Sequence, residues 1–341
     1  MTDIHIRKTR RAGRITLDRP QALNALTYDQ AMAIEAALDD WAQDDEVACV
    51  VIDAAGDRAF CAGGDLQAMY DTASQGDFEF GRKFWRDEYR LNAKVFEFPK
   101  PYVAFMQGYT MGGGVGISCH GSHRIVCETS RIAMPECGVG LVPDVGGSLL
   151  LAQAPGRLGE YLGMTGARMD ASDAILAGFA DYYVPRADWP TLIETLEETG
   201  DWSAVDAAAK DPEDGALMGL RDRIDRDFAG AGAADILRGL GEDEFAHGVR
   251  KAVGRASPLS VVSAVELVRR VRAFDSIRPA LEMEYRFTAR SASQGDFVEG
   301  IRAVIIDKDN TPAWRHADVA SVPHMDMVNM LKPLGADALR L

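Results

Sequence analysis

Short apolar runs alternate with helical patterns along the first 185 residues. Five of these runs predict strands: Ile15–Leu17, Val47–Ile52, Tyr102–Met106, Arg124–Val126 and Arg131–Met134. The run at Ile15–Leu17 is expected to be the first strand of the chain. Strands that alternate with helices in this way predict an α/β core.

A helix is expected to open at Thr27, because Gln30 three positions later completes a capping box. Its apolar stripe is expected at Tyr28, Met32, Ala36, Leu38 and Trp41.

The pattern changes near Trp189. The chain from there to about Ala256 is acidic, rich in Ala and Asp and mostly helical in pattern, and Ser257-Pro258 then opens a long helix that runs through Arg270. Since no flexible linker separates the two parts, we expect a catalytic core at residues 1–186 and a mainly helical region at 187–341 packed on it.

Composition excludes several classes of protein. With 341 residues, the chain is long enough for a sizeable core, and its 52 acids against 37 bases give a net charge of −15. We therefore expect no binding to nucleic acid or to an anionic membrane. No apolar stretch approaches the roughly 20 residues of a membrane span.

Cysteine usage and the N-terminus predict a cytoplasmic protein. The five cysteines are odd in number and form no CxxC pair, which favours reduced thiols. The basic N-terminal cluster has no apolar segment beside it and runs into the first predicted strand, so it is interpreted as mature protein. His120 and His123 lack a third ligand at a suitable spacing, so no metal site is expected.

Two glycine-rich turns follow predicted strands and precede helical patterns. One contains Gly63-Gly64 within Ala59–Leu66, and the other contains Gly112-Gly113-Gly114 within Gly108–Gly116. Backbone N–H groups at two such turns can hold one carbonyl oxygen as an oxyanion hole, although an isolated Gly-Gly is more simply a tight turn. Neither segment matches a dinucleotide-binding or P-loop motif.

Three carboxylates are candidates for chemistry. Glu136 and Asp144 lie in an apolar, glycine-rich segment, where a buried carboxylate must be paired or functional. Alternatively, both are solvated loop acids, or Asp144 caps the following helix. Glu88 lies on a charged helix near Arg86 and Arg90, and its neighbours alone indicate a surface acid.

The chain resembles the crotonase (enoyl-CoA hydratase/isomerase) superfamily, whose fold is an α/β spiral of repeated strand-strand-helix turns. The matching blocks, in the family's order, are Leu17–Pro20, Asn24–Leu26, Ala59–Leu66, Met111–Gly114, Pro135-Glu136 and Thr165-Gly166 through Val184-Pro185. Within the superfamily the resemblance is strongest to the 3-hydroxyisobutyryl-CoA hydrolase branch. It is carried there by Arg86–Tyr89, Met111–Gly116, Ala133–Glu136, Pro143–Gly147, Met283–Arg286, Asp296–Ala303 and Ile305–Asp309.

This resemblance implies hydrolysis of a short 3-hydroxyacyl-CoA thioester, foremost 3-hydroxyisobutyryl-CoA in valine breakdown. It implies that Gly64 and Gly113 form the oxyanion hole, and that Glu136 attacks the thioester or activates water. Asp144 would bind the 3-hydroxyl and assist proton transfer to the leaving thiolate. The implied substrate-binding residues are Glu88, Gly113, Glu136 and Asp144, and the implied coenzyme A-binding residues are Ala62, Gly63, Gly64 and Asp65. No cofactor or metal is implied beyond the coenzyme A of the acyl-CoA substrate, and assembly into a homo-oligomer stays open.

Other activities of the superfamily stay open to different degrees. Hydratases carry a second glutamate where this chain has Gly116, and hydration needs one group for water and another for the α-carbon proton, so hydratase activity is disfavoured. A double-bond isomerase needs only one glutamate. An acyl-CoA dehalogenase, with a carboxylate nucleophile near Asp144, ranks lower. A non-catalytic acyl-CoA-binding protein would have little reason to keep both Glu136 and Asp144.

Overall fold

The structure is a computed structural model that describes residues 3–341. The chain divides into two compact units, each built from three separated stretches. Unit 1 comprises Met1–Gly64, Arg90–Ala133 and Arg168–Met218, and unit 2 comprises Asp65–Tyr89, Met134–Ala167 and Gly219–Leu341. This division interleaves along the chain, and the core at 1–186 with a helical region at 187–341 stays a prediction. The regular elements after residue 186 are all helical.

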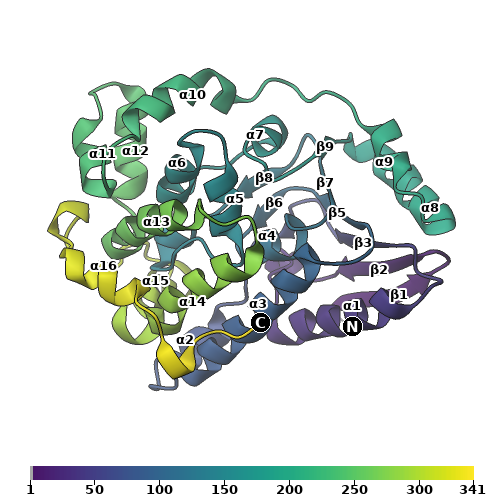
Figure 1. Ribbon diagram of the computed structural model, residues 1–341, viewed down its shortest axis with the longest axis horizontal. Helices are drawn as coiled ribbons and strands as arrows, with labels where there is room; N and C mark the ends of the chain where they lie inside the picture. The colour runs from purple at the N-terminus through teal and green to yellow at the C-terminus, as the bar shows by residue number, and fades with distance from the viewer. Residues whose placement is uncertain (1–2) are drawn as a thin grey trace. The chain divides into compact units, whose positions relative to one another are not determined.

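Unit 1 contains a six-stranded sheet in the order β1-β2-β3-β5-β7-β9 (Figure 1). Its strands are β1 (Ile4–Thr9), β2 (Ala12–Leu17), β3 (Cys49–Ala54), β5 (Tyr102–Met106), β7 (His123–Val126) and β9 (Tyr182–Tyr183). All neighbouring pairs are parallel except β1 with β2, whose antiparallel register sets Ile4 opposite Leu17. The strand β1 corrects the expectation that Ile15–Leu17 comes first. As a half-exposed edge strand with polar residues at alternate positions, it lacks the continuous apolar run of a buried strand.

Helices cover both faces of this sheet. On one face, α8 (Trp189–Thr199) and α9 (Ser203–Ala208) supply Trp189, Leu196 and Val205 to a core that includes Val51 and Phe105 of the strands. Helix α1 (Tyr28–Gln43) lies on the other face. The ring of its Trp41 packs directly on Gly13, where a Cβ would lie 2.4 Å from the nearest ring atom.

Helix α1 begins as predicted, with the Thr27–Gln30 capping box formed. Its apolar stripe is only partly as predicted. Leu38 and Trp41 are buried, but Ala36 is exposed and Ile34 takes the intervening position. Steps of four residues drift around a helix with 3.6 residues per turn, and the buried stripe mixes steps of three and four.

A second, three-stranded parallel sheet in the order β4-β6-β8 determines where the glycine turns lie. Its strands are β4 (Ala59–Cys61), β6 (Tyr109–Met111) and β8 (Arg131–Ala133). The register sets Ala59 opposite Tyr109, and Tyr109 opposite Arg131. Both glycine turns therefore leave the carboxyl edge of this sheet side by side. The short helix α4 (Gly113–Ser118) follows β6, and α7 (Ala171–Leu176) completes the helices of unit 1.

Unit 2 consists mainly of helices. They are α2 (Gln67–Ala73), α3 (Glu79–Phe96, which crosses the boundary between the units), α5 (Gly147–Gln153), α6 (Leu158–Thr165), α10 (Ala216–Asp227, also at a boundary), α11 (Ala233–Gly239), α12 (Glu244–Val253), α13 (Pro258–Val271), α14 (Ile277–Gln294), α15 (Phe297–Ile301) and α16 (His324–Leu331). Helix α13 opens at Pro258 as predicted and packs against α5 and α6.

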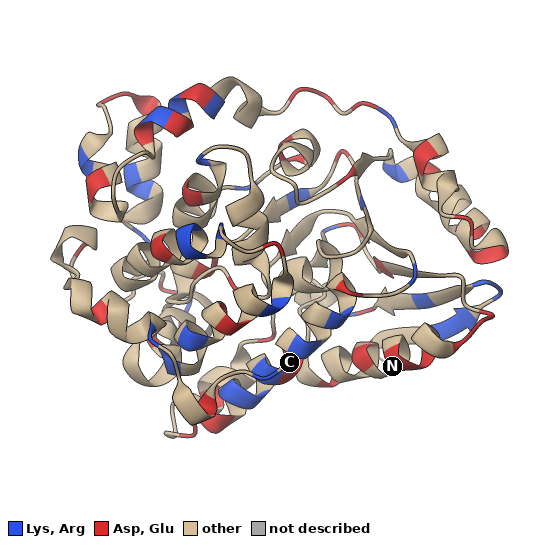
Figure 2. Ribbon diagram, viewed as in Figure 1, with Lys and Arg blue, Asp and Glu red and all other residues tan. Residues whose placement is uncertain are grey.

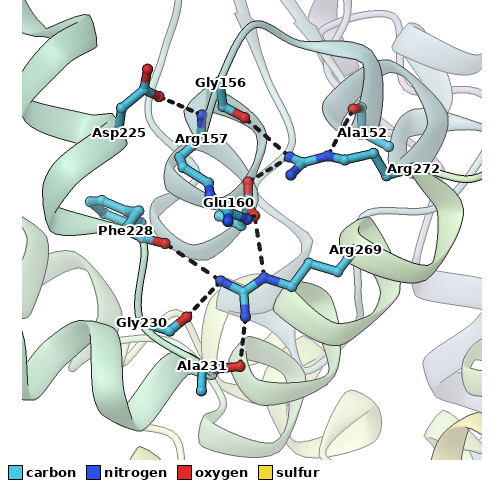
Figure 3. Close-up of polar contacts among 10 residues, drawn as sticks. All are labelled: Ala152, Gly156, Arg157, Glu160, Asp225, Phe228, Gly230, Ala231, Arg269 and Arg272. Atoms are coloured by element: carbon cyan, nitrogen blue, oxygen red, sulfur yellow. Dashed lines mark hydrogen bonds and ion pairs between the residues drawn. The ribbon is translucent and has the colours of Figure 1, made fainter.

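A buried carboxylate ties together three parts of unit 2 (Figure 3). Glu160 of α6 is fully buried and accepts hydrogen bonds from Arg157 at 2.6 Å, Arg272 at 2.9 Å and Arg269 at 3.3 Å. Arg269 also donates to backbone carbonyls of the loop between α10 and α11. Burial alone would raise the pKa of Glu160, but the hydrogen bond from Arg157 and the charge of Arg272 bring it below its ordinary value.

Charges of both signs lie along the surface helices α3 and α10 (Figure 2). They pair locally, as Lys83 does with Asp87 and Arg223 with Asp227. No helix among residues 3–341 is long and apolar enough to cross a membrane.

Candidate active site

The two glycine turns of unit 1 approach each other closely. A Cβ on Gly114 would lie 2.2 Å from the Cys61 carbonyl oxygen, and one on Gly63 would lie 3.7 Å from the Met111 carbonyl oxygen. The backbone at Gly63 has φ +123°, a conformation that glycine adopts readily. Only glycine at 114 lets α4 begin this close to the end of β4.

Both turns present backbone N–H groups that are free for a ligand. Gly113 is the first residue of α4, where an N–H has no acceptor within the helix. Among residues 3–341, neither Gly64 nor Gly113 donates to a backbone acceptor outside its own element. The predicted oxyanion donors therefore lie on neighbouring turns that follow paired strands.

The four residues predicted to bind coenzyme A form a half-exposed turn after β4. In unit 1, Ala62 N–H donates to Leu23 O at 3.1 Å, and Leu26 N–H donates to Gly63 O at 2.9 Å, which fixes the backbone of the turn. Asp65 belongs to unit 2, where its carboxylate accepts weakly from the Gln67 N–H at 3.4 Å. Their accessible surface is compatible with ligand contact.

Glu136 opens a short 3-10 helix (Glu136–Val139) in unit 2 and is only 6% exposed. Its Oε2 is buried and has no hydrogen-bond partner among the described residues. Burial raises the pKa of Glu136 well above its ordinary value, and the negative charges of Asp144 and Glu284 add to this shift. The expectation of a solvated loop acid is therefore wrong for Glu136.

The backbone around Glu136 is held tightly by a neighbouring helix. A Cβ on Gly300 of α15 would lie 2.3 Å from the Val139 carbonyl oxygen, and one on Gly140 would lie 2.5 Å from the backbone of Asp296. Ser257 donates its N–H to Cys137 O at 2.9 Å and its hydroxyl to Asp296 at 2.6 Å. These contacts leave Glu136 little freedom to move.

Asp144 is also buried, at 4% exposure, which rules out a solvated loop acid. Its Oδ2 accepts a hydrogen bond from the Tyr89 hydroxyl at 2.6 Å. Burial raises the pKa of Asp144 to about 7, and the tyrosine hydrogen bond limits the rise. Asp144 does not cap α5 either, because its side chain makes no cap hydrogen bond to that helix.

Glu88 is not the surface acid that its neighbours indicate. It is 4% exposed, and burial together with the charge of Asp144 raises its pKa to about 8. The arginines nearby pair elsewhere: in unit 2 Arg86 donates to Tyr285 and Glu79, and in unit 1 Arg90 donates to Glu35. Glu88 is therefore, like Glu136, a buried acid of unit 2 whose pKa is raised in part by the charge of Asp144.

Two further residues, not predicted as site residues, belong to this group. Tyr89 holds Asp144, and Glu284 of α14 is fully buried, with its pKa raised by burial to about 8. The sequence carries a signal for Glu284, because it occupies the same helical face as the buried Ala280, Leu281 and Thr288. An acid within an apolar stripe is expensive unless it has partners or a function.

His120 and His123, which lack a third candidate ligand in the sequence, do not lie on one helix. His120 follows α4 and His123 begins β7. The five cysteines are buried thiols that form no disulfide within residues 3–341.

Comparisons with known proteins agree on the family. The enoyl-CoA hydratase/isomerase family model matches residues 12–331. A relative named 3-hydroxyisobutyryl-CoA hydrolase, mitochondrial, from Gallus gallus is 36% identical over 99% of this chain and 91% of its own length. A protein of the same name from Rattus norvegicus is 37% identical over 96% of this chain and 88% of its own.

Two solved structures share the fold closely. One, named an enoyl-CoA hydratase, from Rhodobacter sphaeroides, is 53% identical with a TM-score of 0.97 and covers 100% of both chains. Another, named a carnitinyl-CoA dehydratase, from Mycobacterium thermoresistibile, is 39% identical with a TM-score of 0.93 and covers 98% of this chain and 97% of its own. The expected α/β crotonase fold is confirmed, and the chain belongs to the enoyl-CoA hydratase/isomerase family, the crotonase superfamily.

Proposed function

We propose that this protein hydrolyses the thioester of a short 3-hydroxyacyl-CoA, foremost 3-hydroxyisobutyryl-CoA, as a step of valine breakdown. The names of its relatives over nearly the full chain support this reaction. The observation that carries the proposal is the environment of Glu136. Its carboxyl group is buried, and its Oε2 has no hydrogen-bond partner among the described residues. Burial and the charge of Asp144 raise its pKa. No cofactor is proposed beyond the coenzyme A of the substrate, and a cytoplasmic location stays a proposal.

Glu136 acts on the thioester carbonyl by one of two balanced routes. Its carboxylate attacks the carbonyl carbon, the tetrahedral intermediate expels the coenzyme A thiolate, and water then hydrolyses the mixed anhydride to release the acid and regenerate Glu136. Alternatively, Glu136 takes a proton from water and the hydroxide attacks the same carbon. The tetrahedral intermediate then expels the coenzyme A thiolate, which is protonated as Glu136 returns to its ionised form. Both routes need the ionised form of Glu136, so its raised pKa makes the rate increase with pH.

Asp144 is proposed to bind the 3-hydroxyl of the acyl group and to help protonate the leaving thiolate. A pKa of about 7 lets the same group exist in both protonation states near neutral pH. Glu88, with its pKa of about 8, is proposed to contact the substrate as a neutral hydrogen-bond donor at neutral pH.

Gly64 and Gly113 are proposed to hold the developing oxyanion through their backbone N–H groups. Their neighbouring positions in unit 1 support this role, because two preorganised donors stabilise a tetrahedral intermediate without a metal. The turn Ala62–Asp65 is proposed to line the adenine end of coenzyme A.

Hydration of an enoyl-CoA is the second candidate, favoured by the name of the 53% identical structure. Against it, Gly116 in α4 brings no carboxyl group where hydratases carry their second glutamate. Adding water across a double bond would then require Asp144 or Glu88 to manage the second proton.

One assay separates the two reactions. Release of free coenzyme A from 3-hydroxyisobutyryl-CoA is followed with a thiol-reactive dye, and hydration of crotonyl-CoA is followed in parallel. We expect thiol release without hydration. Hydration without thiol release would refute the proposal in favour of the second candidate.

Glu136→Gln tests the residue assignment in the same assay. It should abolish thiol release while leaving acyl-CoA binding intact, because the amide can neither attack nor accept the proton. The exposed Glu194 of α8 offers a matched control, since Glu194→Gln removes a charge without touching a buried acid. Near-normal turnover in Glu136→Gln would show that another group performs the attack.

A further inference from the structure

The turn that carries Asp144 has a strained backbone. Val145 has φ +53° and Gly146 has φ +81°. Positive φ is costly for a β-branched residue such as valine, and it persists only where the surroundings impose it. The turn leads into α5, whose N-cap residue Gly146 has no side chain to cap the helix.

Glu284 supplies the missing cap from α14. Its Oε2 accepts the Gly146 N–H at 2.9 Å, and its Oε1 accepts the Ser148 N–H at 3.1 Å and the Ser148 hydroxyl. One buried carboxylate thus satisfies three donors of the strained segment. Packing between α14 and α5 holds the two elements together.

The same helix also supports the side chain of Asp144. One turn after Glu284, the Thr288 hydroxyl lies 3.4 Å from the Tyr89 hydroxyl, which donates to Asp144. The ring of Tyr285 packs edge-on against the ring of Tyr89, with 6.3 Å between centroids. Helix α14 therefore fixes the backbone after Asp144 through Glu284 and its carboxylate through Tyr89.

We propose that Glu284 is a positioning residue, which holds the Asp144–Ser148 turn in the conformation that aims Asp144 at the substrate's 3-hydroxyl. This inference rests on the proposed function and gives a role to a residue that lies in the matching block Met283–Arg286 but to which the resemblance assigns none. Glu284 itself touches no reacting atom; it acts through Gly146 and Ser148.

The charge of Glu284 gives the proposal a second consequence. Its titratable neighbours are Asp144 in the turn, Glu136 at the start of the 3-10 helix and Tyr89 on α3, and Glu88 on α3 faces Asp144 in turn. Once Glu284 is ionised, above its pKa of about 8, its negative charge helps to keep the pKa of Glu136 high. Its removal should lower that pKa, so the acid limb of the rate profile should move to lower pH.

Glu284→Gln is the decisive variant. An amide offers one acceptor oxygen and places an NH2 group against a backbone donor, so the turn loses support. A displacement of about 1 Å costs about 100-fold in rate, and we expect kcat for 3-hydroxyisobutyryl-CoA to fall by about that factor. The preference for 3-hydroxyacyl over unsubstituted acyl thioesters should fall with it. The exposed Glu282 on the same helix is the matched control, and Glu282→Gln should change neither quantity.

The pKa of Glu136 is read separately by carboxyl-carbon NMR titration of protein with labelled glutamate, with Glu136→Gln used to assign its resonance. A lower pKa in Glu284→Gln than in Glu282→Gln supports the inference whichever reaction the enzyme performs. An unchanged pKa and an unchanged 3-hydroxyl preference in Glu284→Gln would overturn it. Failure of the wild-type protein to release coenzyme A would instead overturn the proposed function, and the NMR result would still decide the role of Glu284.

Ser148→Ala keeps the test decisive if Glu284→Gln does not fold. The change removes one donor to Glu284, which raises the pKa of Glu284 and weakens its hold on the turn. A smaller effect in the same direction is expected for kcat, for the 3-hydroxyl preference and for the pKa of Glu136. Wild-type values of kcat, of the 3-hydroxyl preference and of the pKa of Glu136 in Ser148→Ala would refute the proposal.

Discussion

Gly114→Ala tests the oxyanion hole by displacing it without removing a polar group. The new Cβ would lie 2.2 Å from the Cys61 carbonyl oxygen, whereas ordinary contacts begin near 3.4 Å, so the start of α4 and the end of β4 must separate by about 1 Å. Gly113 moves with α4 and Gly64 follows β4, so their N–H groups no longer converge. Loss of one oxyanion donor costs about 100- to 1,000-fold in rate, and we expect a fall of that size in kcat for coenzyme A release.

The assay compares kcat, KM and thermal unfolding of Gly114→Ala with those of Gly248→Ala. Gly248 lies in α12 with open space where its Cβ would be, so the control adds the same methyl group without a clash. Overpacking should cost Gly114→Ala about 1–3 kcal/mol of unfolding free energy, which a melting curve detects without loss of the folded state. A folded Gly114→Ala enzyme with wild-type kcat would refute the assignment of Gly113 and Gly64 as the oxyanion donors.

Two further predictions concern the buried acids of unit 2. Glu160→Ala leaves its three arginines without their carboxylate partner, which costs about 3–5 kcal/mol. With an unfolding entropy of about 2.1 cal/mol/K per residue over 341 residues, the melting temperature should fall by about 4–7 °C. A change below 1 °C would contradict this interpretation of the network. Glu88 has a folded-state pKa of about 8, above its ordinary value of 4.5. Between pH 4.5 and pH 8 the folded protein therefore binds one more proton at Glu88 than the unfolded chain does. The contribution of Glu88 to the free energy of unfolding is complete below pH 4.5 and is lost as the pH rises toward 8. Melting temperatures measured at pH 5 and pH 8 should therefore converge in Glu88→Gln, and an unchanged difference would show that Glu88 does not titrate in this range.

All five strands that the sequence predicts are present, because Ile15–Leu17, Arg124–Val126 and Arg131–Met134 fall in β2, β7 and β8. The clearest of the predicted strands are those buried on both faces. Val47–Ile52 and Tyr102–Met106 are continuous apolar runs, and the structure forms β3 and β5 there. The edge strand β1 is missed because one neighbour and a half-exposed surface permit basic residues such as Arg7 and Lys8. Short-range capping signals also work, since Thr27 and Gln30 lie within one helical turn.

Burial of the candidate acids depends on contacts between distant parts of the chain. Glu88 lies between arginines in the sequence, but both arginines have other partners in the structure. Glu284 caps a helix that begins more than 130 residues earlier, at a distance which local patterns do not reach. The family resemblance identifies Glu88 as a substrate-binding residue. Glu284 also lies in a matching block, Met283–Arg286, but its role as a cap is recognised only from its position in the structure.

Unit 2 contains two kinds of buried acid, and the difference separates structural from functional roles. Glu160 is as inaccessible as Glu284, but three arginines surround it and bring its pKa below the ordinary value. Glu88, Glu136, Asp144 and Glu284 form no ion pair with Lys or Arg within the described residues, and burial raises the pKa of each. A carboxylate that serves only the fold is stabilised best by permanent cations, which also fix it in the ionised form. Acids that are buried without cations lower the stability of the fold, but they can gain and lose protons near neutral pH. General acid–base or nucleophilic chemistry on a thioester requires this ability to change protonation state.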